Sequence, residues 1–141
     1  KPHYITIVRF FNLKYMTMTE KQLHTIICKY IKMQYPDLYF LSDPSGLKMS
    51  IGMATSLKRT RSNHAQLDII ILEPNNKYNG LILEVKKARS EVFKKDGGFR
   101  KSEHVEKQNH SIKHLENKGY CAKYVFSLDD AIEIIKNYVI N

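Results

Sequence analysis

The sequence predicts an α/β fold in which a central mixed β-sheet is flanked by helices. The first observation is the order of segment types along the chain, which is helix, strand, helix, two strands, helix, strand and helix. The second is a pair of apolar runs, 67–72 and 81–86, whose β-branched and aliphatic residues are typical of strands covered on both faces. The 141 residues suffice for one hydrophobic core, so we expect a single domain over 1–141 with its core at about 19–139.

The first helix is predicted to begin at Glu20, because Thr19 and Gln22 have the spacing of a capping box. Apolar residues then recur at the helical period and form one face. The helix should end just before Pro36, since proline disfavours helical backbone in the residue that precedes it.

The other elements are predicted from apolar periodicity and from the turn residues that separate them. The turn at 74–80 joins the two apolar strands most simply as a hairpin. In chain order, the remaining predictions are an edge or interface strand at 4–11 within an N-terminal extension over 1–18, a strand at 38–41, a helix at about 47–59, a mobile basic loop at 87–101, a helix at about 102–118, a strand at 120–126 and a last helix capped by Ser127.

Composition favours a polyanionic partner. The chain has 23 Lys and Arg against 14 Asp and Glu, a formal net charge of +9 and a pI near 9.5. Each cation placed on a phosphate releases condensed counterions, so nucleic acid is the expected partner, with a merely soluble basic protein as the alternative. No apolar run reaches membrane-spanning length, and no membrane partner is expected. Cys28 and Cys121 lack the spacing of a disulfide framework or a metal site, which favours a reducing cytoplasm.

Three charged side chains interrupt the two apolar strands. Asp68 lies in the first strand, and Glu84 and Lys86 lie on one face of the second. Charges on nearly buried strands are costly to desolvate unless something pairs them. A divalent cation would pair these acids, so we expect Asp68 and Glu84 to meet at one point.

The chemistry of such a site follows from its residue types. Carboxylates are hard oxygen ligands that suit Mg²⁺ or Mn²⁺ better than zinc. A lysine such as Lys86 could orient or deprotonate a water and stabilise charge on a phosphate. Gln108 lies on the buried stripe of its predicted helix, where it joins this pocket or, alternatively, bonds to a backbone carbonyl. Glu20 is either an ordinary first-turn acid or a further metal ligand. Together these groups predict metal-assisted phosphodiester hydrolysis.

The histidines are less informative. His110 and His114 have a spacing that could bind a metal, but both fall opposite the apolar stripe, so we expect solvated surface residues. His64 and His104 lie nearer the predicted pocket, where either could contact a substrate phosphate.

Basic residues cluster in two segments, one before the first acidic strand and one after the second. We expect them to bind the phosphates of DNA. They are Lys58, Arg59, Arg61, Lys87, Arg89, Lys94, Lys95, Arg100 and Lys101.

An acid on one strand followed by Glu84-Val85-Lys86 on the next resembles the PD-(D/E)xK nuclease superfamily. The wider order of segments is similar to the virus-type replication-repair nuclease (VRR-Nuc) family within it. The similarity spans about 19–139 and depends on spacing rather than on one motif. It runs through Glu20, the segment 45–58, the stretch 79–86, Gln108, the segment 115–120 and the closing 127–131. Two departures are Ala65-Gln66-Leu67-Asp68 in place of Gly-x-Pro-Asp, and a longer link between Lys86 and Gln108.

The resemblance implies a restriction-endonuclease-like core and Mg²⁺- or Mn²⁺-dependent cleavage of DNA. It implies metal ligation by Asp68 and Glu84, catalytic roles for Lys86 and Gln108, and a lesser metal role for Glu20. Several relatives prefer branched or flapped DNA, and short members are similar to Holliday junction resolvases that pair as homodimers. A viral member would act in the host cytoplasm, on DNA repair or replication intermediates.

Three hypotheses therefore follow from the sequence. The first is a DNA endonuclease, structure-selective for branched, flap or junction DNA. The second is a non-catalytic, basic DNA-binding module that retains the nuclease fold. The third is a structural α/β protein whose charge is incidental.

Overall fold

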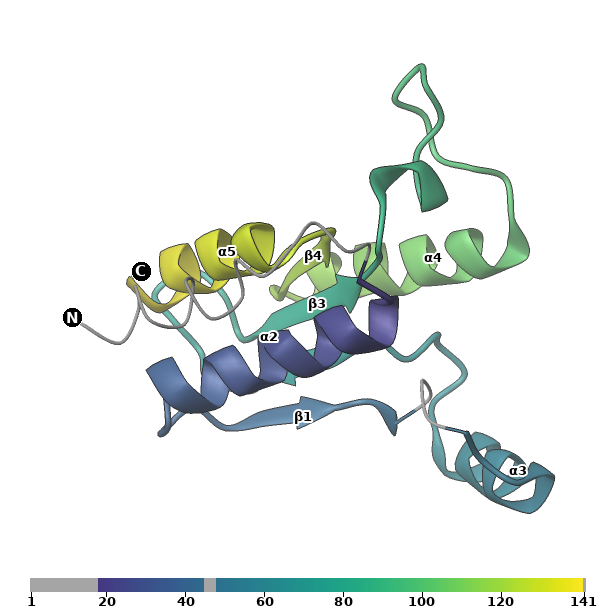
Figure 1. Ribbon diagram of the computed structural model, residues 1–141, viewed down its shortest axis with the longest axis horizontal. Coiled ribbons are helices and arrows are strands. Elements are labelled where there is room, and N and C mark those ends of the chain that lie inside the picture. Colours follow the sequence, from purple (N-terminus) through teal and green to yellow (C-terminus); the bar gives the residue numbers. More distant parts are fainter. Residues whose placement is uncertain (1–17, 45–47, 141) are drawn as a thin grey trace.

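A computed structural model describes residues 18–44 and 48–140, and the strand expected at 4–11 lies outside them. Figure 1 shows the elements arranged around one sheet. They are α2 (Glu20–Gln34), β1 (Phe40–Ser42), α3 (Ile51–Thr60), β2 (Ile69–Ile71), β3 (Leu81–Val85), the 3₁₀ turn η2 (Arg89–Glu91), α4 (Glu103–Asn117), β4 (Cys121–Val125) and α5 (Leu128–Ile140).

The sheet is mixed, as predicted, with strand order β1-β2-β3-β4. β2 pairs antiparallel with both β1 and β3, so the two apolar strands form the expected hairpin. β3 pairs parallel with β4, because the chain crosses over through α4 before it returns to the sheet. All five residues of β3 are buried, which agrees with its unbroken apolar sequence.

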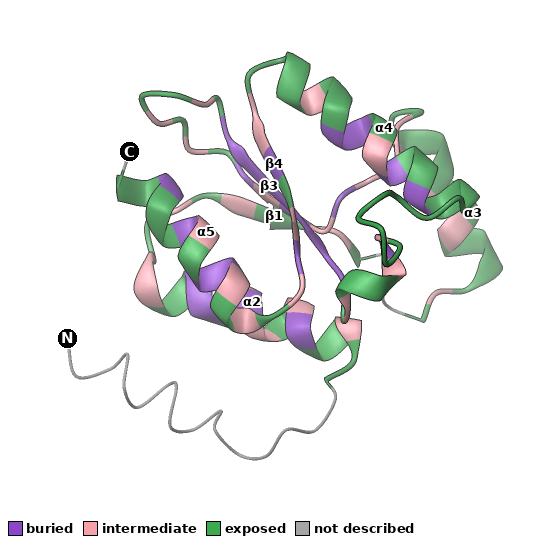
Figure 2. Ribbon diagram, turned by 90° about the horizontal axis from the view of Figure 1, so that it is seen from above, coloured by how far each residue is buried: buried purple, intermediate pink, exposed green. Residues whose placement is uncertain are grey.

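Helices cover the two faces of the sheet (Figure 2). α2 and α5 pack together on one face, and α4 packs against β4 on the other. The larger core lies on the α2–α5 side and includes Ile27, Ile31 and Ile135, all fully buried. A smaller core on the α4 side joins Ile82, Ile112 and Ala122. α5 has a strong apolar face because its buried residues recur at the helical period.

Local sequence signals fix the ends of the helices. The hydroxyl of Thr19 accepts from the Gln22 N–H, and the Gln22 side chain accepts from the Thr19 N–H, so the predicted capping box forms. Ser102 caps α4 in the same way. Gly119 ends α4 at a φ of 84°, a left-handed conformation that glycine adopts without strain.

Two predicted segments need correction here. The first strand is Phe40–Ser42 rather than 38–41, because it pairs with the three residues of β2, of which Ile71 lies opposite Phe40 and Ile69 opposite Ser42. α3 begins at Ile51 rather than 47, since the hydroxyl of Ser50 accepts from the Met53 N–H and caps the helix there. α3 also buries none of its residues and projects from the rest of the fold (Figure 1).

The segment at 87–101, which we call the basic arm, is not the structureless loop that its glycines suggest. It contains η2 and an isolated antiparallel bridge between Phe93 and Phe99. Val92 is fully buried and accepts, through its carbonyl, from the Arg100 N–H. Backbone pairing within the segment, together with the burial of Val92, therefore gives structure to a stretch that local propensity alone assigns to a loop.

No helix in the described ranges is both long and apolar enough to cross a membrane.

Candidate active site

The candidate site lies where β3 ends. Glu84 is the penultimate residue of the strand, and Lys86 follows directly, with its N–H donating to the Val125 carbonyl of β4 at 2.9 Å. Their exposed fractions are 2% and 4%, so two charged side chains are buried at the edge of the sheet. Such burial requires partners, and the neighbouring elements supply some of them.

Glu84 is the centre of the hydrogen-bond network. Its Oε1 accepts from Lys86 Nζ at 2.9 Å and from the Nε2 amide of Gln108 on α4. Gln108 is 3% exposed, as predicted for a residue on the buried stripe. Of the two predicted alternatives for Gln108, the structure shows the first: its Nε2 amide donates to the Glu84 carboxylate in the pocket and not to a backbone carbonyl.

Two buried oxygens at this point lack a protein partner. Within the described chain, neither Glu84 Oε2 nor Gln108 Oε1 has a hydrogen-bond partner. An unpaired buried acceptor costs about 1–3 kcal/mol, and more when it is charged. Unpaired buried acceptors of this kind are groups that a bound cation or a water would satisfy.

Asp68 reaches the same region from the neighbouring strand. It directly precedes β2, and its Oδ2 accepts from the Val85 N–H at 2.7 Å. This bond connects the carboxylate to the backbone between Glu84 and Lys86. The structure thus brings together the three residues that the sequence singles out on the two strands.

The two acids of the site have raised pKa values. Burial, followed by the charge of Asp68, raises the pKa of Glu84 to about 8. Burial also raises the pKa of Asp68, although the Val85 N–H opposes this shift. Two buried acids whose proton affinity is raised in this way are stabilised as anions when a cation lies between them.

Lys86 behaves differently. Burial lowers the pKa of its ammonium, but nearby carboxylates, above all that of Glu84, more than offset burial and leave the pKa above its ordinary value. A lysine whose pKa is raised is a poor proton acceptor at neutral pH. Of the two roles considered for Lys86, orienting a water or a phosphate therefore fits better than deprotonating one.

Glu20 lies at the edge of the site. Its carboxylate is 3.9 Å from Lys86 Nζ, and its side chain is 45% exposed. Burial raises its pKa, while the Lys86 charge opposes the shift. Across residues 18–44 and 48–140, no group of three His, Cys, Asp or Glu side chains is arranged to hold one metal ion. Glu20 is thus close to the site without completing a three-residue ligand set.

A cleft of about 920 Å³ opens on this region between α2 and the end of β1. Its lining includes Glu20, Asp68 and two histidines, His24 and His104. His24 Nε2 is hydrogen-bonded to Ser42 Oγ at 2.8 Å. No pattern in the sequence singles out His24, which becomes visible only once α2 is placed beside β1.

Two histidines, His64 and His104, were expected to contact a substrate phosphate. Of these two, His104 lines the cleft and His64 does not. Burial, and then the charge of Lys86, lowers the pKa of His104. His64 lies elsewhere, because its ring stacks on His110 and His114 with centroid distances of 5.7 and 4.3 Å. His110 and His114 are exposed on α4, as predicted.

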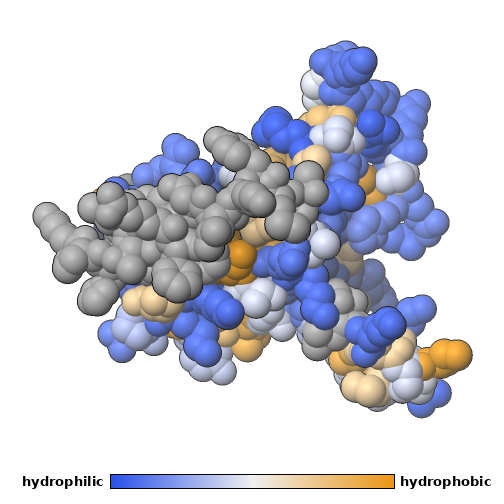
Figure 3. Space-filling model, in the orientation of Figure 1, coloured by the Kyte–Doolittle hydropathy of each residue, from blue (hydrophilic) through white to orange (hydrophobic). Residues whose placement is uncertain are grey.

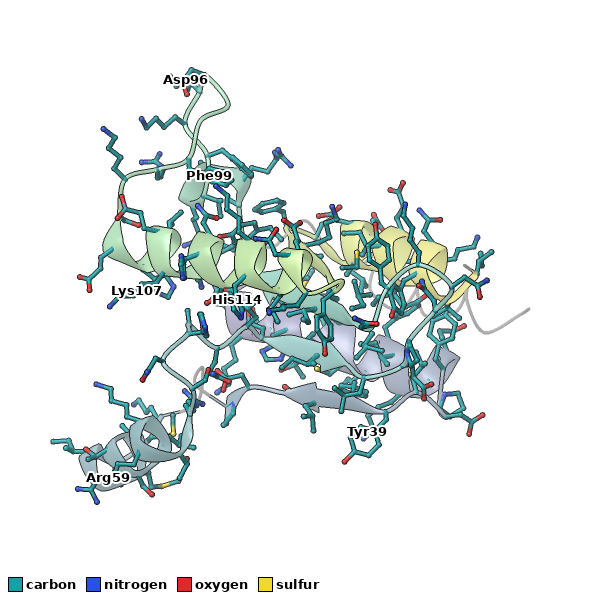
Figure 4. The ribbon with its side chains drawn as sticks, turned by 180° about the vertical axis from the view of Figure 1, so that it is seen from behind. Tyr39, Arg59, Asp96, Phe99, Lys107 and His114 are labelled. Carbon is teal, nitrogen blue, oxygen red and sulfur yellow. The ribbon has the colours of Figure 1, made fainter. Side chains whose placement is uncertain are left out.

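Most of the predicted phosphate-binding residues are exposed and lie on two projections, α3 and the basic arm. Figures 3 and 4 show both projections on the same side of the molecule, with Arg59 on α3 and Asp96 on the arm. Arg61 is an exception, because its guanidinium donates to Asp43 and is half-buried.

Glu84 and Asp68 are the residues that could hold a divalent cation. Their carboxylates, together with the unpartnered Glu84 Oε2 and Gln108 Oε1, form a set of hard oxygen donors. The chemistry of these donors suits Mg²⁺ or Mn²⁺ and does not suit a thiolate-seeking metal.

Comparison with known proteins places the fold. The sequence matches no protein-family model and no curated protein. The structure is similar to a solved "VRR_NUC domain protein", with 25% sequence identity and a TM-score of 0.64. The alignment covers 87% of this chain and 89% of that one. The resemblance seen in the sequence is therefore confirmed, and the chain has the α/β fold of a VRR-Nuc domain, a nuclease-type domain.

Proposed function

We propose that this protein is a metal-dependent DNA endonuclease, selective for branched, flap or junction DNA. The observation that supports it most is the buried Glu84 carboxylate, which keeps one oxygen without a protein partner beside Asp68 and Lys86. A purely structural acid would pair both oxygens or remain exposed. The VRR-Nuc fold supports the same activity.

Asp68 and Glu84 would hold Mg²⁺ or Mn²⁺, with Glu20 as an additional ligand through water. Because two carboxylates would supply only part of a coordination shell, the rest would be completed by water and by a phosphate oxygen, as is common for Mg²⁺. The bound ion would polarise the phosphate and lower the pKa of a coordinated water.

The chain's own groups have separate tasks. Lys86 would hold its positive charge beside the scissile phosphate and orient the attacking water. Gln108 would fix the Glu84 carboxylate through its amide hydrogen bond, so that the second oxygen stays aimed at the ion. His104, at the start of α4, would contact a neighbouring phosphate.

DNA would lie across the side of the molecule that carries α3 and the basic arm. Lys58, Arg59 and the cations of the arm would bind its phosphates. Cutting two strands of a symmetric junction needs two sites, so the functional unit for that substrate would be a homodimer.

The test compares the wild-type protein with Glu84→Gln and with a matched surface variant, Glu133→Gln on α5. Nicking of branched and linear DNA is measured in Mg²⁺, in Mn²⁺ and in EDTA. We expect Glu84→Gln to reduce the cleavage rate by about 100-fold or more, because the substitution removes a negative charge at the reacting centre. Glu133→Gln should retain the wild-type rate. Equal cutting by wild type and Glu84→Gln would refute the proposal.

A non-catalytic DNA-binding module is the second candidate. The observation that favours it is the Glu84–Lys86 ion pair, which partly neutralises the carboxylate without any metal. In that case DNA binding would persist in EDTA, and neither metal would give cleavage.

A further inference from the structure

Backbone hydrogen bonds and a glycine turn define the conformation of the basic arm. The Lys94 N–H donates to the Gly98 carbonyl at 2.7 Å, and the Arg100 N–H donates to the Val92 carbonyl at 2.8 Å. The turn between them needs Gly97, whose φ is 85°. The arm is therefore a short hairpin anchored at its base by buried Val92.

A ladder of aromatic rings connects the arm to the sheet. Phe99 stacks on Phe93 with centroids 5.1 Å apart, and Phe93 packs against Phe126 at 6.2 Å. Phe126 in turn stacks on Tyr124 of β4. The Arg89 guanidinium lies over both Phe93 and Phe126, at 4.9 and 5.1 Å from their centroids. These contacts hold the inner rings, and Phe99 is joined to them by its stacking on Phe93 and by the backbone bridge between the two residues.

That last ring is open to solvent. Phe99 is 45% exposed and is the ring at the opposite end of the ladder from Tyr124 of β4. Its inner neighbour Phe93 is only partly buried, so the outer end of the ladder remains accessible. A half-exposed aromatic ring that is itself stacked on a second ring offers a flat apolar face on which a planar group can stack.

The arm that carries Phe99 is rich in cations. It has six basic residues against two acids, and one of those acids, Asp96, accepts from the Gly98 N–H and so stabilises the turn. A hollow of about 460 Å³ at the arm is lined by Phe93, the ring on which Phe99 stacks, together with Arg89, Lys94, Lys95 and Arg100, and no acid lines it. Exposed aromatic surface beside a basic groove is the combination that binds single-stranded nucleic acid.

We propose that the basic arm binds unpaired bases, with Phe99 as the stacking platform and Lys94, Lys95 and Arg100 as contacts to the adjoining phosphates. The inference rests on the proposed function, and it deepens it by naming the chemical feature that would distinguish branched or flapped DNA from plain duplex. Duplex DNA presents its phosphates but no free base face, so it would use the cations alone.

The experiment measures binding without cleavage, by fluorescence anisotropy in EDTA, for a single strand and for a blunt duplex of the same sequence. Three variants are compared with wild type: Phe99→Leu, Phe99→Tyr and, as a matched exposed apolar residue on α5, Val139→Ala. A 2-aminopurine in the single strand reports stacking directly through quenching of its fluorescence.

We expect Phe99→Leu to weaken single-strand binding about 5- to 100-fold, the range for losing one stacked base, and to abolish quenching. Duplex binding should stay within about twofold, and Phe99→Tyr and Val139→Ala should behave as wild type. Unchanged single-strand binding by Phe99→Leu, or an equal loss for both DNAs, would overturn the inference. Because no metal is present, this outcome is independent of whether the protein cuts DNA.

Discussion

At the scale of single residues, the chemistry depends on how the two oxygens of Glu84 are used. Oε1 accepts from Lys86 and Gln108, whereas Oε2 has no partner among the described residues. Alternation along a strand and the helical stripe predicted that these three side chains share a pocket. The sequence could not predict which oxygen stays unpaired, because that depends on the rotamer of Gln108.

Metal-free protein should lose stability as the pH rises. The pKa of Glu84 is raised from 4.5 to about 8, so between these values the folded state binds more protons than the unfolded state. The free energy of unfolding must therefore fall as pH increases through this window. Urea unfolding in EDTA at about pH 5 and at about pH 8 should show this fall for wild type. In Glu84→Gln the slope should be clearly flatter, and equal slopes would contradict the assignment of the shift to Glu84.

Gln108 should matter for activity more than for folding. Replacement by Leu removes the amide donor to Glu84 and leaves Lys86 as the one remaining side-chain donor, among the described residues, to that carboxylate. We expect a loss of about 10- to 100-fold in metal affinity or cleavage rate, as is common when the group that orients a ligand is removed. Exposed Lys107→Gln, one residue earlier on α4, is the control. Wild-type metal affinity and rate in Gln108→Leu would mean that the amide does not position Glu84.

At the scale of elements, sequence signals were reliable where the structure is decided locally. The capping box of α2, the Gly119 stop and the hairpin of β2 and β3 all form as predicted. The start of α3 was misplaced, because its apolar residues suggested a longer helix while the Ser50 cap decides the boundary. The sequence predicts a basic loop at 87–101 but not the bridge inside it, because one contact that supports the bridge, between Phe93 and Tyr124 of β4, joins residues far apart in sequence.

Two isoleucines should distinguish the packed helix from the projecting one. Ile27 on α2 is fully buried, whereas Ile51 on α3 is 88% exposed. We expect Ile27→Ala to lower the free energy of unfolding by about 2–5 kcal/mol, because it leaves a cavity in the core. Ile51→Ala should change it by no more than about 0.5 kcal/mol. Chemical denaturation of both variants measures this difference, and similar values would mean that α3 is packed in solution.

At the scale of the whole molecule, many of the predicted phosphate-binding cations lie on one side of the fold. α3 and the basic arm project on one side, with the cleft that contains Asp68 and His104 opening on α2 and β1. Composition predicted a basic protein that binds phosphate, but it could not show that the cations lie on projections flanking the site. That arrangement comes from the placement of α3 and the arm by the tertiary fold.

The salt dependence of duplex binding should report these projections. Neutralising Lys58 and Arg59 together, or Lys94 and Lys95 together, should lower the slope of log K against log salt by about one for each phosphate that is no longer neutralised. Lys136→Gln on α5 provides the control, since α5 covers the opposite part of the fold. Slopes that do not change in either double variant would place the DNA on another surface.

The most direct measurement is the anomalous scattering of Mn²⁺ in crystals of the wild-type protein and of Glu84→Gln. In wild type we predict one strong peak between the carboxylates of Asp68 and Glu84, and in the variant a peak that is absent or greatly reduced. A wild-type crystal with no peak there, or with Mn²⁺ held by other residues, would contradict the claim that these two acids share an ion.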